Sequence, residues 1–275
     1  MYKNLPLNVF DVTLGADLTI MEEATELIQR VKNNDNLPMI TSCCSSWVRY
    51  AELFYPDILK HLSTTKSPIS MMGALTKNYF ADKKKFNSED IFAVAITPCT
   101  SKKWEITKDG LRQTDAVITI NELTEYLKNI NIDFKKIKRA NFDNDIGEGS
   151  SAGLIFGASG GVMESALRTA YYLLTKKELK NIEYTKVRGY NNLREATVKM
   201  GKYILKVAVI DEMANAIPIL NKIKNKTCDY DFIEIMNCRG GCIGGGGQPY
   251  HLINEEQITK EKRMVSLYRK DQISK

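Results

Sequence analysis

Residues 91–99 read IFAVAITPC, and this stretch decides the fold. A continuous apolar run that ends at a cysteine is typical of a parallel strand buried on both faces, with a reactive group at its end. Residues 37–44 (LPMITSCC) and 231–238 (DFIEIMNC) repeat the arrangement. Ligands of parallel α/β sheets bind beyond the carboxyl ends of the strands. The sequence therefore predicts an α/β fold in which thiols from separate strands meet at one place.

Other segments extend this pattern. Further strands are expected at residues 8–12, 116–119 and 205–210. Helices are expected at residues 121–128 and 162–174, and from Thr19, which forms a capping-box pattern with Glu22. The predicted architecture is two lobes of mostly parallel, twisted sheets flanked by helices.

Composition restricts the class of protein. Of 275 residues, 43% are hydrophobic and 26% are charged, which is typical of a globular chain. No stretch approaches the ~18 uncharged apolar residues of a membrane span, and the N-terminus lacks the apolar core of a signal peptide. We therefore expect a cytoplasmic protein with no membrane partner.

The net charge of +6 is mildly basic. The basic runs of the chain, at residues 83–85 and 135–139, are short and separated, whereas nucleic-acid binding needs a clustered basic stripe. We expect no nucleic-acid partner. The runs are either solvated surface or a docking face for an acidic protein.

The chain has six cysteines and only two histidines. Disulfides are disfavoured in a reducing cytoplasm, and soft thiolates select zinc, copper(I) or iron–sulfur clusters. The pair in Cys238-Arg-Gly-Gly-Cys242 can face one metal cluster, because glycines let the backbone approach a bulky inorganic group. The alternative for this segment is a flexible glycine-rich loop. A phosphate loop is disfavoured because no Lys-Ser/Thr follows the glycines.

Three cysteine motifs, in this order, resemble the cluster-binding motifs of iron-only (FeFe) hydrogenases. They are TSCCSSW at 41–47, TPCTSKKWE at 97–105 and EIMNCRGGC at 234–242. The segments LSTTKSP at 62–68 and SSAGLIFGASGGVME at 150–164 resemble the same family. The resemblance implies a hydrogenase that interconverts protons and electrons with dihydrogen.

The resemblance also implies an H-cluster, in which a 4Fe–4S cluster is joined to a diiron unit that carries CO, cyanide and azadithiolate ligands. Four cysteines match its thiolate ligands, namely Cys44, Cys99, Cys238 and Cys242, the last of which bridges the two parts. Four thiolates hold a cubane, and burial and hydrogen bonds set its potential.

Residues around the cluster are implied in the same way. Cys43 matches the thiol that passes protons to the bridging amine, although from the residues alone it could be a small buried hydrophobe. Lys102 matches the lysine that hydrogen-bonds a cyanide. Met236 and Phe156 match apolar neighbours of the diiron unit.

A proton relay of Glu26, Ser63 and Glu23 leading to Cys43 is also implied by the resemblance. Glu23 and Glu26 are helix neighbours. The apolar stripe of this helix instead places Glu26 almost opposite the core, so the pattern alone predicts a solvated surface carboxylate.

The chain departs from the family pattern at two motif positions. Ser45 stands where proline is usual after the cysteine pair, and it could add a hydroxyl near the cluster. Thr97 stands where methionine is usual, and it would leave space and add a hydrogen-bond donor near the diiron ligands. Neither change removes a ligand.

The expected domains are an N-terminal lobe at residues 1–88, a C-terminal lobe at residues 89–258 and a tail at residues 259–275, with the cluster between the lobes. No segment matches the family's usual first strand, so the first lobe is expected to lack it. The chain is then either a fragment or in need of a completing chain.

Expected partners are ferredoxin, or a similar electron carrier, and the proteins that mature the cofactor. Two rival functions remain open. The first is a non-catalytic redox or gas sensor, or an iron–sulfur assembly protein, on the same fold. The second is a structural thiolate site that holds zinc.

Overall fold

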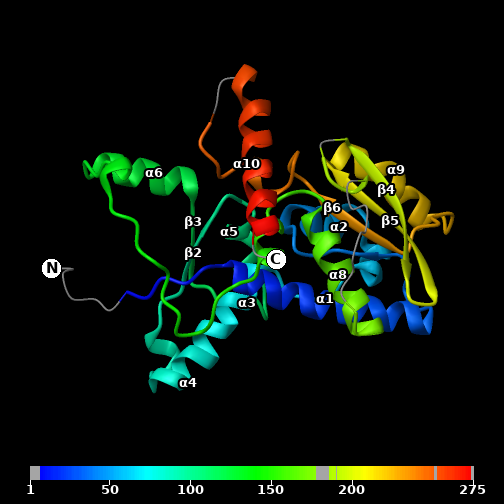
Figure 1. Cartoon of the computed structure of the whole chain (residues 1–275), viewed down its shortest axis with the longest axis horizontal. Coiled ribbons are helices and arrows are strands. Elements are labelled where there is room, and N and C mark those ends of the chain that lie inside the picture. Colours follow the sequence, from blue (N-terminus) through cyan, green and yellow to red (C-terminus); the bar gives the residue numbers. More distant parts are fainter. Residues whose placement is uncertain (1–6, 178–185, 190, 251–252, 274–275) are drawn as a thin grey trace.

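The computed structural model describes residues 7–177, 186–189, 191–250 and 253–273, which build two separate sheets with helices around them (Figure 1). The strands are β1 (Met39–Ile40), β2 (Val94–Thr97), β3 (Ala116–Thr119), β4 (Leu193–Met200), β5 (Tyr203–Asp211) and β6 (Phe232–Met236). The α-helices are α1 (Thr13–Asn33), α2 (Ser45–Phe54), α3 (Pro68–Leu75), α4 (Ala81–Lys84), α5 (Lys102–Glu105), α6 (Ile120–Asn129), α7 (Ser151–Ile155), α8 (Gly161–Thr175), α9 (Met213–Lys224) and α10 (Ile253–Ile273). The predicted α/β class is confirmed.

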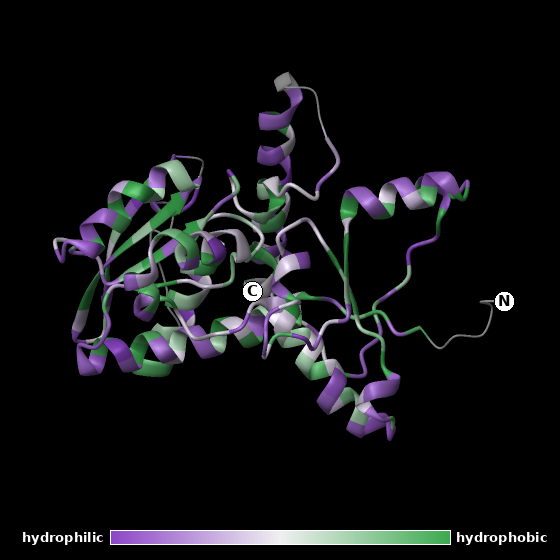
Figure 2. Ribbon diagram, turned by 180° about the vertical axis from the view of Figure 1, so that it is seen from behind, coloured by the Kyte–Doolittle hydropathy of each residue, from purple (hydrophilic) through white to green (hydrophobic). Residues whose placement is uncertain are grey.

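The larger sheet has the strand order β1-β6-β5-β4. β6 pairs in parallel with β1 and with β5, while β4 is antiparallel to β5. Alternate residues of β5 face opposite sides, so Val207 and Val209 pack with α1 and α8, whereas Ala208 and Ile210 pack with α2 and α9. Figure 2 shows these apolar strands between helices that carry hydrophilic residues. Burial of both faces explains the continuous apolar runs of the sequence.

The smaller sheet consists of β2 and β3, which are parallel. α6 begins directly after β3 at a capping box. The Thr119 hydroxyl accepts a hydrogen bond from the backbone amide of Glu122 at 3.2 Å, and Glu122 Oε2 accepts one from the backbone amide of Thr119 at 2.9 Å. The strand and the helix predicted for this part of the chain are therefore confirmed.

Two predictions for the N-terminal region are wrong. Residues 8–12 form no strand, and the backbone amide of Val9 instead donates to the Asp143 carboxylate at 2.7 Å. α1 begins at Thr13, where the Asp11 carboxylate accepts a hydrogen bond from the Thr13 amide at 3.0 Å. The Thr19 hydroxyl does not cap the helix, because it donates to a backbone carbonyl one turn earlier.

The two sheets do not follow the predicted lobes. The larger sheet takes β1 from residues 1–88 and its other strands from residues 89–258. The predicted domain boundary at residue 88 therefore does not coincide with a division between the two sheets, and it remains a prediction. Most of the expected tail lies in α10, whose Asp271 pairs with Arg168 of α8 at 3.0 Å. None of the helices in the described part of the chain has the length and apolar character that a membrane crossing requires.

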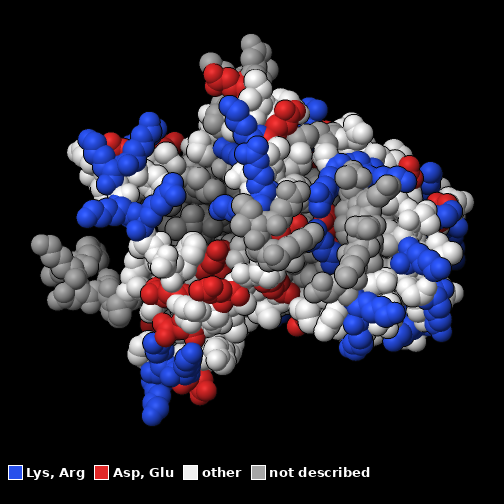
Figure 3. Space-filling model, in the orientation of Figure 1, with Lys and Arg blue, Asp and Glu red and all other residues white. Residues whose placement is uncertain are grey.

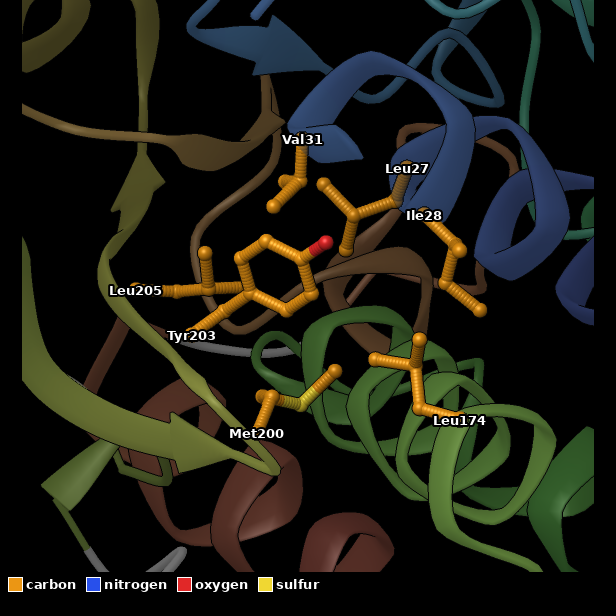
Figure 4. A pocket seen from close by; sticks show the side chains of 7 residues that line it. All are labelled: Leu27, Ile28, Val31, Leu174, Met200, Tyr203 and Leu205. Atoms are coloured by element: carbon orange, nitrogen blue, oxygen red, sulfur yellow. The ribbon is translucent and has the colours of Figure 1, made fainter. Parts of the chain in front are cut away.

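A small cavity lies between α1, α8 and the β4–β5 pair (Figure 4). Its volume of about 10 Å³ is at the lower limit for one water molecule. The lining side chains are those of Leu27, Ile28, Val31, Leu174, Met200, Tyr203 and Leu205. The cavity is a packing defect of the core rather than a site for chemistry, since the Tyr203 hydroxyl is its only polar side-chain group.

Candidate metal-cluster site

The four thiols predicted as ligands follow strands of both sheets. Cys44 lies between β1 and α2, Cys99 follows β2 of the smaller sheet, and Cys238 follows β6. Cys242 begins a 3-10 turn in the same loop as Cys238. The backbone amide of Asn237 donates to Cys44 Sγ at 3.5 Å, so the ends of β1 and β6 lie side by side.

The thiols influence one another electrostatically. Burial raises the pKa of Cys44, Cys238 and Cys242, that of Cys238 to about 11. The nearby Cys44 and Cys99 thiols raise the pKa of both Cys238 and Cys242 further, because adjacent thiolates repel one another. The four sulfurs therefore lie within electrostatic range of each other. A bound cationic metal centre reverses this effect, because coordination deprotonates a thiol.

The donor set consists of sulfur alone. Within the described ranges, no group of three or more Cys, His, Asp or Glu side chains is placed to hold a single metal ion. Thiolates are soft ligands that suit zinc, copper(I) and iron–sulfur clusters, and four of them are the usual ligands of a 4Fe–4S cluster. The predicted ligands therefore fit the chemistry of an iron–sulfur cluster.

Phe156 and Met236 form an apolar wall beside the thiols. Both are buried and pack in one cluster with Cys43, Ile20 and Val162, against which Cys44 is partly buried. Burial raises the pKa of the Cys43 thiol well above its ordinary value. Cys43 is therefore a neutral thiol that holds a proton at neutral pH.

Lys102 is buried in an ion pair. Its ammonium lies 2.7 Å from Glu105 Oε2 and donates to the backbone carbonyl of Cys43 at 2.9 Å. Burial lowers the pKa of Lys102, but the Glu105 carboxylate outweighs it and raises that pKa overall. Burial likewise opposes ionisation of Glu105, but Lys102 lowers its pKa overall. Three hydroxyl groups also donate to Glu105, those of Ser45, Ser67 and Ser70.

Both departures from the family motifs are buried next to predicted ligands. Ser45 follows Cys44 directly and is 1% exposed, and its hydroxyl binds Glu105. Thr97 ends β2, two residues before Cys99, and is 6% exposed. Ser45 therefore contributes to the polar surroundings of the Lys102 ion pair.

Glu23 carries a buried carboxyl group whose two oxygens have no hydrogen-bond partner among the described residues. Burial, reinforced by the charges of Glu234 and Glu26, raises its pKa to about 8. The Ser63 hydroxyl and the Ser42 backbone amide offset part of this shift, although neither makes a hydrogen bond of normal geometry to the carboxyl. An unsatisfied buried carboxyl is costly and is characteristic of functional sites.

The prediction that Glu26 is a solvated surface carboxylate is wrong. Its side chain is 15% exposed, because the segment after Leu62 covers this side of α1. Glu26 Oε2 accepts hydrogen bonds from the Ser63 hydroxyl at 2.8 Å and from the Thr64 amide at 2.9 Å. Arg30 lies 2.6 Å from Oε1 of the same carboxylate and donates to the Leu62 carbonyl at 2.8 Å. Because Thr64 is exposed, Glu26 lies at the border between interior and solvent.

The group that holds the Cys238–Cys242 loop in place was not predicted from the sequence. Asp211, the buried last residue of β5, accepts a hydrogen bond from the Gly240 amide at 2.9 Å and lies 3.0 Å from the Arg194 guanidinium. The Ser159 amide donates to the Gly240 carbonyl at 3.0 Å. This loop is thus fixed from two sides by the body of the fold.

Arg30 and Glu105 were also not predicted as site residues, although their spacing from Glu26 and Lys102 in the sequence indicates ion pairs. Arg30 is four residues after Glu26, and Glu105 is three after Lys102, which are the spacings of helix neighbours. Asp211 gave no such signal, because its partners lie 17 and 29 residues away.

The chain is similar to known proteins over most of its length. The family model described as the C-terminal domain of the iron only hydrogenase large subunit matches residues 3–246. Iron hydrogenase 1 of Clostridium pasteurianum is 44% identical over 273 residues, which cover 96% of this chain and 47% of the relative. The mouse nuclear prelamin A recognition factor is 32% identical over 253 residues, covering 87% of this chain and 54% of that protein. The chain thus spans about half the length of the curated relatives it matches.

A solved structure agrees in fold. A variant of the FeFe-hydrogenase HydA1 from Chlamydomonas reinhardtii superposes with a TM-score of 0.80 at 35% identity, covering 94% of this chain and 74% of that one. The family model covers all four predicted ligand cysteines. The chain therefore belongs to the iron-only hydrogenase family, in which it matches the C-terminal domain of the large subunit.

Proposed function

We propose that the chain catalyses the reversible conversion of two protons and two electrons into dihydrogen. The observation that carries this proposal is the placement of four thiols beside a fifth, protonated thiol (Cys43) and a buried ammonium (Lys102). A purely structural metal site needs the four ligands alone. The additional proton-bearing groups are what proton chemistry requires.

We assign the cofactor to the four thiols. Cys44, Cys99, Cys238 and Cys242 would hold an H-cluster, a 4Fe–4S cluster linked to a diiron unit with CO, cyanide and azadithiolate ligands. When bound, this group supplies the redox chemistry of hydrogen, and the protein supplies position, protons and electron access. Met236 and Phe156 keep water from the site by their apolar contacts with Cys43.

The protein's part in proton transfer follows from its own groups. Cys43 holds a proton beside the cluster site, and Glu23 is close enough to raise its pKa. The Glu23 carboxyl, whose pKa is about 8, is protonated at neutral pH and can donate or accept. Ser63 bridges toward Glu26, whose carboxylate lies at the border with solvent. These groups form a path from solvent to Cys43.

Lys102 orients the site electrostatically. Its ammonium has three protons, of which one faces Glu105 and one the Cys43 carbonyl. The third can donate to an anionic ligand such as cyanide, and such a charge-assisted hydrogen bond is strong.

Electrons are proposed to come from ferredoxin or a similar carrier, and the diiron unit from maturation proteins. The net charge of +6 favours an acidic carrier through long-range attraction.

A second candidate is a non-catalytic iron–sulfur protein on the same fold. The similarity to the nuclear prelamin A recognition factor, which its name does not describe as a hydrogenase, favours it. Thr97, which replaces a methionine of the family motif, also favours it.

The deciding experiment loads anaerobically purified protein with the diiron unit through the maturation proteins. We expect CO and cyanide infrared bands together with hydrogen evolution from reduced methyl viologen. Cys43→Ala should keep the bands and lose nearly all turnover, whereas Cys228→Ala should keep both. Bands without turnover in the wild-type protein would select the second candidate, and one zinc per chain without iron would refute both.

A further inference from the structure

Two carboxyl groups in the core of the molecule lack a cationic partner. Figure 3 shows Lys, Arg, Asp and Glu side chains over the surface, whereas Glu23 and Glu234 are each 0% exposed. Among the described residues, the other buried carboxyl groups all pair with a lysine or an arginine, namely those of Glu105, Glu164, Asp211 and Asp271. No such pair is formed by Glu23 or Glu234 in the described ranges. Burial of an unpaired charge is costly, so the surroundings of these two groups decide which of them can be ionised.

The carboxylate of Glu234 is held by the backbone at the start of α8. Its Oε1 accepts a hydrogen bond from the Gly160 amide and its Oε2 accepts one from the Met163 amide, each at 2.7 Å. Amide donors and the positive end of a helix dipole favour the ionised form of a carboxyl group. Because alternate residues of a strand share a face, Glu234 lies between Phe232 and Met236 on the face of β6 that packs against α1 and α8.

The carboxyl group of Glu23 approaches the same place from α1. On this helix, Glu23 lies about one turn from both Ile20 and Leu27, so the three side chains share a face. Ile20 packs in one cluster with Met236, and Leu27 packs in another cluster with Phe232. Glu23 therefore faces the position of β6 that lies between these two apolar residues, which is the position of the second unpaired carboxyl group.

These surroundings divide a proton unequally between the two groups. The Glu23 oxygens have no hydrogen-bond partner among the described residues, so burial opposes ionisation of this carboxyl group. Burial raises the pKa of Glu23 to about 8 but that of Glu234 only to about 7, because the two backbone amides offset part of its effect on Glu234. Nearby carboxylates also repel each other, so the ionisation of one opposes that of the other.

The remaining charged neighbours do not remove this difference. The titratable groups that face the pair are those of Glu26, Cys43, Arg194, Asp211 and Tyr268. Arg194 lowers the pKa of Glu234 and Asp211 raises it, so their effects oppose each other. Glu26, at the border with solvent, raises the pKa of Glu23 less than Glu234 does. The thiol and the phenol are uncharged at neutral pH, because burial raises their pKa.

We propose that Glu23 and Glu234 form a carboxyl pair that holds one proton, in which Glu234 is the anion and Glu23 the acid. Glu234 thus keeps a proton on the group that faces Cys43, and it is a positioning residue because it acts through Glu23. The contribution to proton transfer rests on the proposed function, whereas the carboxyl pair itself does not.

The test is an infrared pH titration of the purified full chain. The carbonyl stretching band of protonated carboxyl groups reports on Glu23 and Glu234, because ordinary carboxyl groups are already ionised above about pH 6. In the wild-type protein we expect this band to disappear in two steps, of which the lower belongs to Glu234. In Glu234→Gln, the Glu23 carboxyl should ionise at lower pH, with an acid dissociation constant about threefold to tenfold higher. In Glu23→Gln, the single remaining step should coincide with the lower wild-type step.

Glu164→Gln is the matched control. It removes another buried carboxylate near the start of α8, one that pairs with Arg188 at 2.6 Å. This variant also disturbs α8, but the charge beside Glu23 stays in place. The upper step should therefore remain at its wild-type pH.

Three results would overturn the proposal. The first is a Glu23 step that is unchanged in Glu234→Gln, and the second is an equal shift of that step in Glu164→Gln. The third is a remaining step in Glu23→Gln that lies above the lower wild-type step, because Glu23 would then be the more acidic group. This last variant decides the question even if Glu234→Gln does not fold. None of these measurements needs a bound cofactor, so an inactive enzyme with the expected titration would contradict the proposed function and leave the carboxyl pair intact.

Discussion

Lys102 Nζ lies 2.7 Å from Glu105 Oε2, and this buried ion pair joins α5 to the loop that carries Cys43, because the same ammonium donates to the Cys43 carbonyl. The pair therefore links the Cys99 segment of the smaller sheet to the Cys43-Cys44 segment of the larger one. Three serine hydroxyls donate further hydrogen bonds to the Glu105 carboxylate. Groups on both sheets are thus held in register by side chains of the protein itself.

Glu105→Gln should strongly destabilise the protein. The substitution leaves the Lys102 charge buried without a counter-ion, for which we expect the free energy of unfolding to fall by about 3 kcal/mol. Anaerobic urea unfolding followed by circular dichroism measures this. Asp109→Asn is the control, because it breaks the exposed pair with Arg112 and such pairs contribute little. Equal changes in the two variants would contradict the assignment.

Asp211→Asn should loosen the Cys238–Cys242 loop. It leaves the Arg194 guanidinium buried without its anion, so we expect a loss of about 3 kcal/mol in the free energy of unfolding. We also expect less iron per chain after anaerobic reconstitution with iron and sulfide. Asp229→Asn, which removes the exposed pair with Lys206, should change neither quantity appreciably. Full iron loading of Asp211→Asn would refute the role of Asp211 in positioning the loop.

Because of Glu23, the free energy of unfolding should fall as pH rises. Its pKa is about 8 in the folded protein against an ordinary value of 4.5, so the folded state binds more protons between these values. The stability from the neutral carboxyl is fully present below pH 4.5 and is lost as pH rises through about 8.

Glu23→Gln remains neutral, so its free energy of unfolding relative to the wild-type protein should increase between about pH 5 and pH 9. Urea unfolding across this range measures the difference. Glu22→Gln, at an exposed position of the same helix, should follow the wild-type curve. A pH-independent difference for Glu23→Gln would count against the raised pKa.

Cys242→Ser should abolish normal cluster binding, whereas Cys228→Ser should not. Cys242 lies near the other predicted ligand thiols, while Cys228 packs at the edge of the core near α9. Iron analysis and electron paramagnetic resonance of the reduced, reconstituted proteins distinguish the two. An unchanged spectrum in Cys242→Ser would remove that thiol from the ligand set.

Short-range patterns predicted the buried strands well. The apolar runs that became β5 and β6 were recognisable because both faces of these strands are buried between helices. The run at residues 91–96 also predicted β2, but burial on both faces is wrong for this strand, because Val94 and Ile96 are 46% and 53% exposed. β4 was missed because only Arg194, Val198 and Met200 of its residues are buried, and one of these is charged. Neither an edge strand nor a buried arginine has a distinctive local pattern, since both depend on partners elsewhere in the chain.

For the candidate site, Cys44 and Cys238 could be placed together because β1 and β6 are parallel neighbours whose carboxyl ends share one edge. The same argument does not apply to Cys99, which follows a strand of the other sheet. The environment of Glu26 could not be predicted, because the covering segment near Ser63 is 37 residues away in sequence. The roles of the individual residues came from the resemblance and remain predictions.

The pairing of β1 with β6, which joins Met39 to Phe232, also determines when the site can form during synthesis. A chain still emerging from the ribosome cannot close this sheet until β6 has been made. Cys44 and Cys99 are therefore synthesised well before Cys238 and Cys242 can join them. Contacts between such remote segments make folding slow. Binding of one cluster by all four predicted ligands therefore follows synthesis of the Cys238–Cys242 loop.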